Sequence, residues 1–280
     1  MKLGVTTPVV TLNRATAVAW EHTAGTEDLV SIAEAADRLG YDFLTCSEHV
    51  AIPVERVERR GAVYWDPLAT LSFLAARTSR IRLATHVLVL GYHHPAQLVK
   101  QYSTLDRLSG GRVVLGVGAG ALEEEFDLLG AEFEGRGREA DRAIREIRLH
   151  WGRPEVDGFV FEPASERTDV EVWVGGRTGL SLRRAVELGN GWVPFAMDRD
   201  KMIAALERYE RPAGFEVILW AHGLDPLSEP ERAVERIEDA VSLGATLVNT
   251  RVVAESAAHW IEQAEGLMEL TDADDPGATR

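Results

Sequence analysis

The chain contains a single cysteine, Cys46, among 280 residues, which excludes an internal disulfide. With no cluster of thiols, the sequence offers no zinc or iron–sulfur centre of the cysteine type, and we expect a cytoplasmic protein. The chain also lacks an apolar run of the ~18 residues that a membrane-spanning helix needs. Its first residues lack the charged and apolar regions of a signal peptide, so we expect neither export nor a membrane.

Positive charge is scarce as well. The chain has 30 Lys and Arg against 45 Asp and Glu, a formal net charge of −15. A field of this sign repels phosphate backbones and anionic membrane surfaces. We therefore expect no nucleic acid partner and no membrane partner, and we take the substrate to be a small molecule.

Hydrophobic residues make up 45% of the chain and charged residues 27%, which is typical of a globular protein with a sizeable core. Short β-branched apolar segments alternate with longer segments of helical periodicity, and this alternation indicates a parallel sheet. The predicted strands are residues 3–7, 43–46, 81–90, 112–117, 170–174, 191–195, 215–220 and 246–252. The predicted helices are residues 27–39, 67–77, 95–108, 122–129, 136–151, 180–188, 199–209, 230–243 and 256–268.

Eight strand–helix units favour a closed (β/α)8 barrel, or TIM barrel, over an open sheet, because closure leaves no edge strand. We expect one catalytic domain over residues 1–270 and a disordered polar tail over residues 271–280. Two insertions interrupt the pattern. Residues 50–64 follow the second strand and are placed as a lid, whereas residues 153–169 precede the fifth strand and belong to the outer or lower side.

In such a barrel the chemistry lies where the strands end at their C-terminal face. No HxxxH, HxH or paired carboxylate places two ligands on one element there, so we expect no metal site. The candidate residues at these ends are Thr6, Thr7, Glu48, His49, His86, Gly118, Ala119, Gly120, Gly175, Gly176, Arg177, Thr178, Trp192, His222, Asn249 and Arg251.

Residues 116–121 read Gly-Val-Gly-Ala-Gly-Ala and superficially match a dinucleotide-binding fingerprint. A Rossmann domain would place this turn after its first strand, but here three strands precede it, so NAD binding of that type is disfavoured. We interpret the glycines as a loop kept free of Cβ atoms so that a flat group can approach its backbone.

A second glycine-rich turn, residues 175–179, lies between a strand and a helix. Exposed N–H groups and the helix dipole attract an anion at such a turn, and Arg177 with Thr178 would reinforce the attraction. A tight turn with an exposed arginine is the alternative. A basic turn at the functional face of an acidic chain favours phosphate.

Glu48 and His49 end the second strand. A carboxylate next to an imidazole at a barrel mouth suits proton handling or contact with a cofactor. A buried structural histidine is the alternative. We take both residues as catalytic candidates.

Six segments carry a resemblance to a known family, and the match as a whole extends from residue 1 to about 265. They are Ser47-Glu48-His49-Val50, residues 81–89, His94-Pro95, residues 105–112, residues 115–120 and Gly189-Asn190-Gly191-Trp192. The chain resembles the luciferase-like oxidoreductases in these segments, and in particular their F420-dependent subgroup.

The resemblance implies a deazaflavin or flavin at the barrel mouth, with its ring on a bulge of the third strand. In F420-dependent members this bulge often holds a non-prolyl cis peptide, which here would join His86 and Val87. Glu48 and His49 correspond to the family's Asp-His pair beside the ring. Position 121 is Ala, where sugar-phosphate dehydrogenases of the family carry a catalytic Glu, which argues against that substrate class.

The resemblance also implies the rest of the cofactor site. The cofactor phosphate would lie on the loop from Gly175 to Thr178. The residues expected to bind the cofactor are Glu48, His49, His86, Val87, Gly118, Ala119, Gly120, Gly175, Gly176, Arg177, Thr178 and Trp192.

Three functions are compatible with this pattern. The first is an oxidoreductase that transfers a hydride between F420 and a small organic substrate. The second is an FMN-dependent monooxygenase, which would need a separate reductase to supply reduced FMN. The third is a barrel that binds a flavin or deazaflavin without catalysis. We expect a homodimer in each case.

Overall fold

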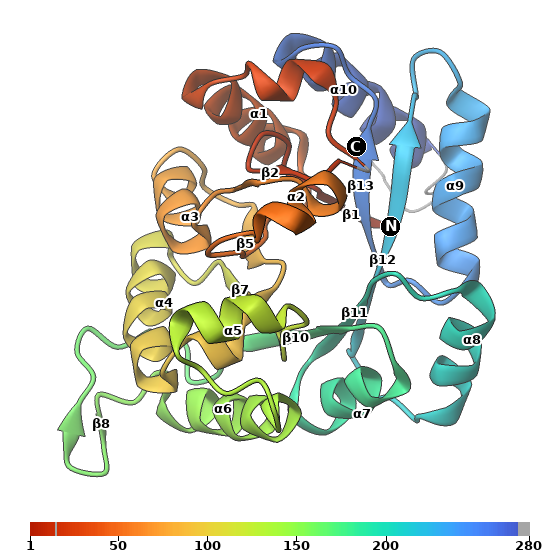
Figure 1. Cartoon of the computed structure of the whole chain (residues 1–280). Coiled ribbons are helices and arrows are strands. Elements are labelled where there is room, and N and C mark those ends of the chain that lie inside the picture. Colours follow the sequence, from red (N-terminus) through yellow and green to blue (C-terminus); the bar gives the residue numbers. More distant parts are fainter. Residues whose placement is uncertain (15, 274–280) are drawn as a thin grey trace.

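The secondary structure follows the predicted alternation closely. A computed structural model describes residues 1–14 and 16–273 (Figure 1). The barrel strands are β1 (Lys2–Val5), β3 (Phe43–Cys46), β5 (Arg82–Thr85), β7 (Val113–Gly118), β10 (Glu171–Gly176), β11 (Gly191–Pro194), β12 (Glu216–Leu224) and β13 (Leu247–Val252). Short strands outside this set are β2 (Thr11–Leu12), β4 (Val63–Tyr64), β6 (Leu88–Val89), β8 (Glu155–Val156) and β9 (Phe159–Val160).

Helices separate the strands and surround the barrel. They are α1 (Thr26–Leu39), α2 (Val54–Arg60), α3 (Pro67–Ala75), α4 (Pro95–Ser109), α5 (Glu123–Leu129), α6 (Arg136–His150), α7 (Gly179–Leu188), α8 (Arg199–Arg208), α9 (Pro230–Ser242) and α10 (Ala257–Ala273). Helix α4 shows how local sequence sets the bounds. Pro95 occupies its first position, where a missing N–H costs nothing, and Gly110 ends it with a φ of 71°.

Eight parallel strands close into a barrel. Strand β1 pairs with β3 and with β13, and the pairing continues through β5, β7, β10, β11 and β12 back to β13. The predicted (β/α)8 barrel is therefore confirmed. One predicted strand, residues 81–90, is in fact interrupted: β5 ends at Thr85 and β6 begins at Leu88.

An apolar layer fills the middle of the barrel. Its side chains come from one inward-facing position on each of seven strands, and each is at most 1% exposed. These residues, which we call the apolar plug, are Phe43, Ala84, Val114, Trp173, Val193, Ile218 and Leu247. On β1 the corresponding position is Gly4, where a Cβ atom would lie 2.1 Å from the ring of Phe43. Because strand side chains alternate, the residues two positions further along face the mouth.

The two insertions lie at opposite ends of the barrel. The first carries α2 and β4, and β4 pairs antiparallel with β2, so this insertion is held at the mouth. The second carries the β8–β9 hairpin, which projects from the side of the molecule near α4 (Figure 1). Arg167 fixes this insertion by donating to Val113 O, at the first residue of β7, and to Asp106 Oδ1, each at 2.7 Å. Both placements match the prediction.

Helix α10 continues to Ala273, so it includes the first residues of the expected tail. The remainder of that tail, residues 274–280, lies outside the described residues. None of the helices described is both long enough and apolar enough to cross a membrane.

A network of charged side chains occupies the lower end of the barrel, below the apolar plug. Arg82 donates to Glu171 at 2.7 Å and also contacts Asp42 and Glu216. Trp173 Nε1 donates to both glutamates, at 3.0 Å to Glu171 and 2.7 Å to Glu216. Burial, together with the hydrogen bond to Glu171, raises the pKa of Glu216 to about 7 in spite of Arg82. The two glutamates therefore share a proton below neutral pH.

This shared proton gives the fold a pH dependence. A raised folded-state pKa stabilises the protein at low pH, and the stabilisation is lost as the pH rises through about 7. Between pH 5 and pH 8 the unfolding free energy of wild type should fall, and in Glu216→Gln this fall should be smaller by about 1 to 2 kcal/mol. Urea denaturation at several pH values measures this decline. Glu231→Gln, an exposed change on α9, is the control, and an equal pH dependence in wild type and Glu216→Gln would refute the prediction.

Candidate active site

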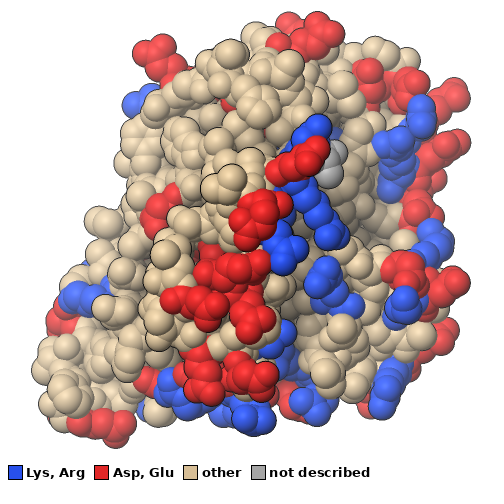
Figure 2. All heavy atoms as spheres, in the orientation of Figure 1, with Lys and Arg blue, Asp and Glu red and all other residues tan. Residues whose placement is uncertain are grey.

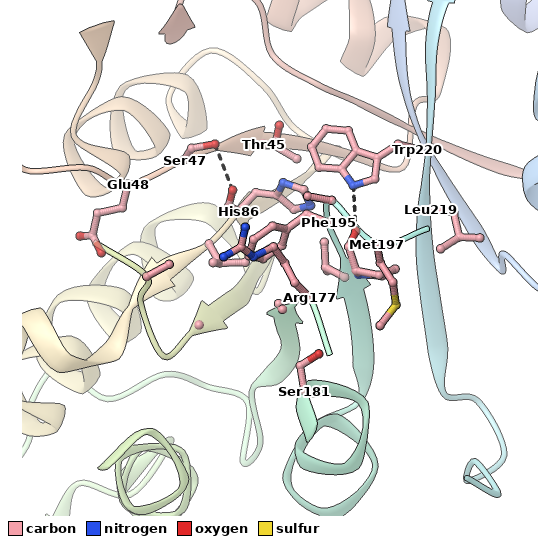
Figure 3. Close-up of a pocket in the computed structure, with 18 of the residues that line it drawn as sticks. Thr45, Ser47, Glu48, His86, Arg177, Ser181, Phe195, Met197, Leu219 and Trp220 are labelled. Carbon is pink, nitrogen blue, oxygen red and sulfur yellow. Dashed lines mark hydrogen bonds between the residues drawn. The ribbon is translucent and has the colours of Figure 1, made fainter. Parts of the chain in front are cut away.

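A cavity of about 980 Å³ opens at the C-terminal mouth of the barrel, above the apolar plug (Figure 3). Residues at or near the C-terminal ends of all eight barrel strands line it, and its volume suits a cofactor together with a small substrate. The structure brings most of the predicted site residues together here. Those that line the cavity are Glu48, His49, His86, Val87, Gly118, Ala119, Gly120, Gly175, Gly176, Arg177 and Thr178.

Val87 forms a bulge between β5 and β6 that enters the cavity. The peptide joining His86 and Val87 is cis, as the family resemblance implied. The side chain of Val87 fits against two glycines, because a Cβ atom at Gly118 or at Gly175 would come within 2.9 Å of a Val87 methyl group. A Cβ atom at Gly116 would lie 1.9 Å from Thr85 O.

This packing gives the glycines of segment 116–121 a structural role that the sequence did not show. The missing Cβ atoms of Gly116 and Gly118 make room for residues 85–87 of the chain itself, and that of Gly120 makes room for Phe126, at 2.6 Å. The sequence showed that something approaches these glycines closely. It did not show that the approaching groups are the neighbouring strand and, at Gly120, the ring of Phe126 on α5.

His86 lies beside this bulge, at the floor of the cavity. Its ring packs edge-on against Trp220, with centroids 4.8 Å apart, and its backbone carbonyl accepts a hydrogen bond from Ser47 (Figure 3). The Nε2 atom is buried and has no partner among the described residues. Burial, with a smaller contribution from His222, lowers the pKa of His86 to about 4, so the ring is neutral at physiological pH.

His49 is held by a buried carboxylate. Its Nδ1 lies 2.6 Å from Glu125 Oε2, which leaves Nε2 as the nitrogen available to a ligand in the cavity. Glu125 is 1% exposed and also accepts hydrogen bonds from Tyr92 Oη at 2.9 Å and from the backbone nitrogens of Val50 and Ala51. Burial opposes its ionisation, but these hydrogen bonds together keep the pKa of Glu125 below its usual value. The pair matches the arrangement of a proton-transfer imidazole with an orienting carboxylate.

Glu125 is absent from the predicted site. It belongs to a run of three glutamates in the first turn of α5, where acidic residues commonly favour the helix dipole in solvent. A signal was nevertheless present, because Glu125 stands three positions after Leu122 and one before Phe126, on the buried side of the helix.

Glu48 lies at the edge of the cavity, apart from His86 and Trp220 (Figure 3). Its carboxylate accepts a hydrogen bond from Val89 N at 2.6 Å, and the other oxygen lies 2.7 Å from His93 Nε2. Burial opposes protonation of His93, but this hydrogen bond raises the pKa of the ring above its usual value. Glu48 thus ties β3 to β6, and both of its oxygens are engaged.

The loop from Gly175 to Thr178 forms one end of the cavity, at the N-terminus of α7. Arg177 and Thr178 are exposed, and no ion pair of Arg177 occurs in the described part of the chain. Thr178 O accepts hydrogen bonds from the nitrogen and the hydroxyl of Ser181, at 2.9 and 2.7 Å. A Cβ atom at Gly176 would lie 2.3 Å from Ser181 Cβ, so this glycine lets α7 begin directly against the strand.

Trp192 does not line the cavity. The residue after it, Val193, faces the barrel interior, so Trp192 faces outward, where it is fully buried and donates to Ser181 Oγ at 3.0 Å. The structure therefore corrects its expected position beside the cofactor and shows a residue that supports α7.

The cavity is basic although the chain is acidic. Six arginines line it, against two acidic residues, Glu48 and Asp239. Figure 2 shows basic side chains gathered along the hollow at the centre of this face, and acidic side chains on the side where α5 lies. The arginines are Arg60, Arg136, Arg177, Arg184, Arg236 and Arg251. Such an arrangement attracts anions to the mouth.

Comparison with known proteins gives a family match over most of the chain. The family model of the luciferase-like monooxygenases matches residues 1–223. A 4-hydroxyprotoasukamycin monooxygenase from Streptomyces nodosus subsp. asukaensis is 28% identical over 239 residues, covering 79% of this chain and 59% of that protein. An F420-dependent glucose-6-phosphate dehydrogenase from Kribbella flavida is 28% identical over 209 residues, covering 68% of this chain and 61% of that protein.

Comparison with a solved structure supports the fold and carries no conclusion about function. The crystal structure of the monooxygenase RslO1 from Streptomyces bottropensis superposes with a TM-score of 0.73 at 21% sequence identity. The superposition covers 96% of this chain and 98% of that one.

The buried carboxylate of Glu125 gives a testable prediction. In Glu125→Gln an amide NH2 replaces one carboxylate oxygen and cannot accept the hydrogen bonds that this oxygen accepts. We therefore expect the unfolding free energy to fall by about 2 to 3 kcal/mol. Urea denaturation measures this loss. Glu124→Gln, on the same turn but partly exposed, is the matched control and should lower stability far less than Glu125→Gln does, because it loses only a surface ion pair with Arg56. Equal stabilities of Glu125→Gln and wild type would show that the carboxylate is not needed.

Proposed function

The chain belongs to the luciferase-like monooxygenase family, and we propose that it is an F420-dependent oxidoreductase that transfers a hydride between the deazaflavin and a small organic substrate. The relatives described above include a monooxygenase and an F420-dependent dehydrogenase. Family membership thus supports an oxidoreductase with a flavin-type cofactor, and the choice of F420 rests on the cavity itself.

The floor of the cavity fits a flat heteroaromatic ring. The Val87 bulge provides an apolar surface, and the unpartnered Nε2 of His86 lies beside it. A buried ring nitrogen without a hydrogen bond is costly, and a polar edge of a bound ring would satisfy it. Because His86 is neutral, it can do so without adding charge next to the ring.

The α7 end of the cavity carries the argument for F420. Three arginines, Arg136, Arg177 and Arg184, line this end beside the loop from Gly175 to Thr178. Among residues 1–14 and 16–273, only Arg184 of these three is paired with a carboxylate, that of Asp141. FMN carries a single phosphate, whereas the side chain of F420 carries a phosphodiester followed by several carboxylates. Two arginines without an acidic partner suit the longer anionic chain better.

The protein's own residues would handle the proton that accompanies the hydride. Bound F420 supplies or accepts the hydride, and we assign proton transfer at the substrate oxygen to His49 Nε2. Glu125 holds the opposite ring nitrogen and so orients the ring. Glu48 has neither oxygen free, and we propose that it acts indirectly by holding β6 and the Val87 bulge in place.

An FMN-dependent monooxygenase is the second candidate, and the similarity to the Streptomyces monooxygenase over 79% of the chain favours it. Such an enzyme would bind reduced FMN made by a separate reductase. A barrel that binds the cofactor without catalysis would show saturable binding and no turnover. Cofactor titration separates the first two candidates, and turnover of a substrate panel separates both from the third.

We expect F420 to bind at least tenfold more tightly than FMN, and Arg177→Ala to weaken F420 binding about three- to tenfold, because an exposed charge contributes modestly. Fluorescence titration of the purified protein with each cofactor measures both effects. Arg183→Ala is the matched control, since Arg183 is also on α7 but pairs with Glu187 outside the cavity. Comparable affinity for FMN, or no detectable binding of F420, would overturn the proposal.

The role of His49 predicts a separate kinetic effect. His49→Gln keeps a hydrogen-bonding side chain but cannot titrate near neutral pH, so we expect the protein to fold and bind F420 while turnover falls by about 10²- to 10⁴-fold. The pH profile of kcat on a substrate found in the panel measures the loss. Full activity of His49→Gln at every pH would assign the residue to packing and redirect the search for the proton donor to His222.

A further inference from the structure

The half of the cavity opposite α7 is built by the lid insertion and the segment that follows β1 (Figure 1). Strands β2 and β4 pair there, with Thr11 opposite Tyr64. Gly61 has a φ of 79°, and a Cβ atom on it would lie 2.0 Å from Leu12 O, so α2 is seated tightly against β2. We call Thr11, Arg60 and Tyr64 the lid wall; all three line the cavity.

Arg60 is the charged group of the lid wall. The neighbouring carboxylates are already paired with other arginines, Glu58 with Arg14 and Glu124 with Arg56. Within residues 1–14 and 16–273, Arg60 forms no ion pair, although its carbonyl accepts a hydrogen bond from Tyr64 Oη at 2.8 Å. Hydrogen bonds from its own backbone and from Arg56 lower the pKa of Glu124, and Arg60 lies near enough to add to this effect, but Glu124 forms its ion pair with Arg56. The partly buried guanidinium of Arg60 is therefore available to an anionic ligand.

A second observation points to a ligand at the same wall. The hydroxyl of Thr11 is buried and has no hydrogen-bond partner among the described residues, and the same is true of Thr6, at the end of β1. Both side chains line the cavity. Buried hydroxyls are normally satisfied, so these two call for a polar group that the chain itself does not supply.

The proton donor lies beside this wall as well. The ring of His49 packs edge-on against Tyr64, with centroids 4.5 Å apart. A substrate held by the lid wall would therefore extend past His49 toward the Val87 bulge, where the proposed cofactor ring lies.

We infer that the substrate is a small organic acid, an oxo acid or the corresponding hydroxy acid, whose carboxylate is bound by Arg60 and Thr11; this inference rests on the proposed function. In the reducing direction the carbonyl carbon accepts the hydride from reduced F420, which is thereby oxidised. The carbonyl oxygen accepts the proton from His49 Nε2, and a hydroxy acid forms. The reverse direction returns the proton to His49 and the hydride to F420.

The test compares each acid with its own neutral analogue. Benzoylformate, phenylpyruvate and 3-benzoylpropionate, each beside its primary amide, are titrated calorimetrically into the F420-loaded protein. We expect at least one acid to bind tenfold or more tightly than its amide. In Arg60→Gln that preference should fall below threefold, with the affinities for the amide and for F420 unchanged. Arg59→Gln, one residue earlier, exposed and outside the cavity lining, is the matched control and should retain the preference.

Three outcomes would overturn the inference: no preference for any acid, a preference that survives Arg60→Gln, or weaker F420 binding in Arg60→Gln, which would assign Arg60 to the cofactor. The F420 titration run on the same samples keeps the two proposals apart. Normal F420 binding without an acid preference removes the substrate class and leaves the proposed function standing. If F420 does not bind, the proposed function is wrong, and the inference about the substrate loses its basis with it.

Discussion

The fit of one valine side chain between glycines determines the shape of the mouth. Val87 occupies the space that Cβ atoms would take on Gly118 and Gly175, so the third strand can bulge into the barrel between its neighbours. His86, on the floor of the cavity, directly precedes that valine. Arg177, at the basic end, follows Gly175 by two residues. The contact between Val87 and Gly175 therefore helps to position both parts of the cavity. Close packing of this kind tolerates little change in volume, because neighbouring backbone cannot yield as a flexible side chain does.

The sequence predicted the barrel and both insertions, and most of the site residues that it predicted line the cavity, because these features depend on periodicity and on where strands end. It did not predict relationships that depend on the phase of a strand or on a distant partner. Trp192 and Val193 are both buried, as is usual in a parallel strand covered on both sides, so the sequence could not show which faces inward. Likewise, Glu125 meets His49 across 76 positions, and nothing local specifies that pairing.

The distribution of charge separates the outside of the molecule from its cavity. A formal net charge of −15 repels anions at long range, yet six arginines line the cavity at the mouth. Arg177 lies at the α7 end of the cavity and Arg60 on the lid wall, whereas His86, on the floor, is neutral. Under the proposals above, the anionic groups of cofactor and substrate would lie at these two sides, and the neutral His86 would lie between them.

The apolar plug has a consequence for how this protein can change over evolutionary time. It separates the charged network around Arg82 and Glu216 from the cavity by a full layer of buried side chains. Substitutions at sites that share no partners combine nearly additively. Over evolutionary time, substitutions that change stability at one end of the barrel can therefore accumulate largely independently of those that change the ligand at the other end.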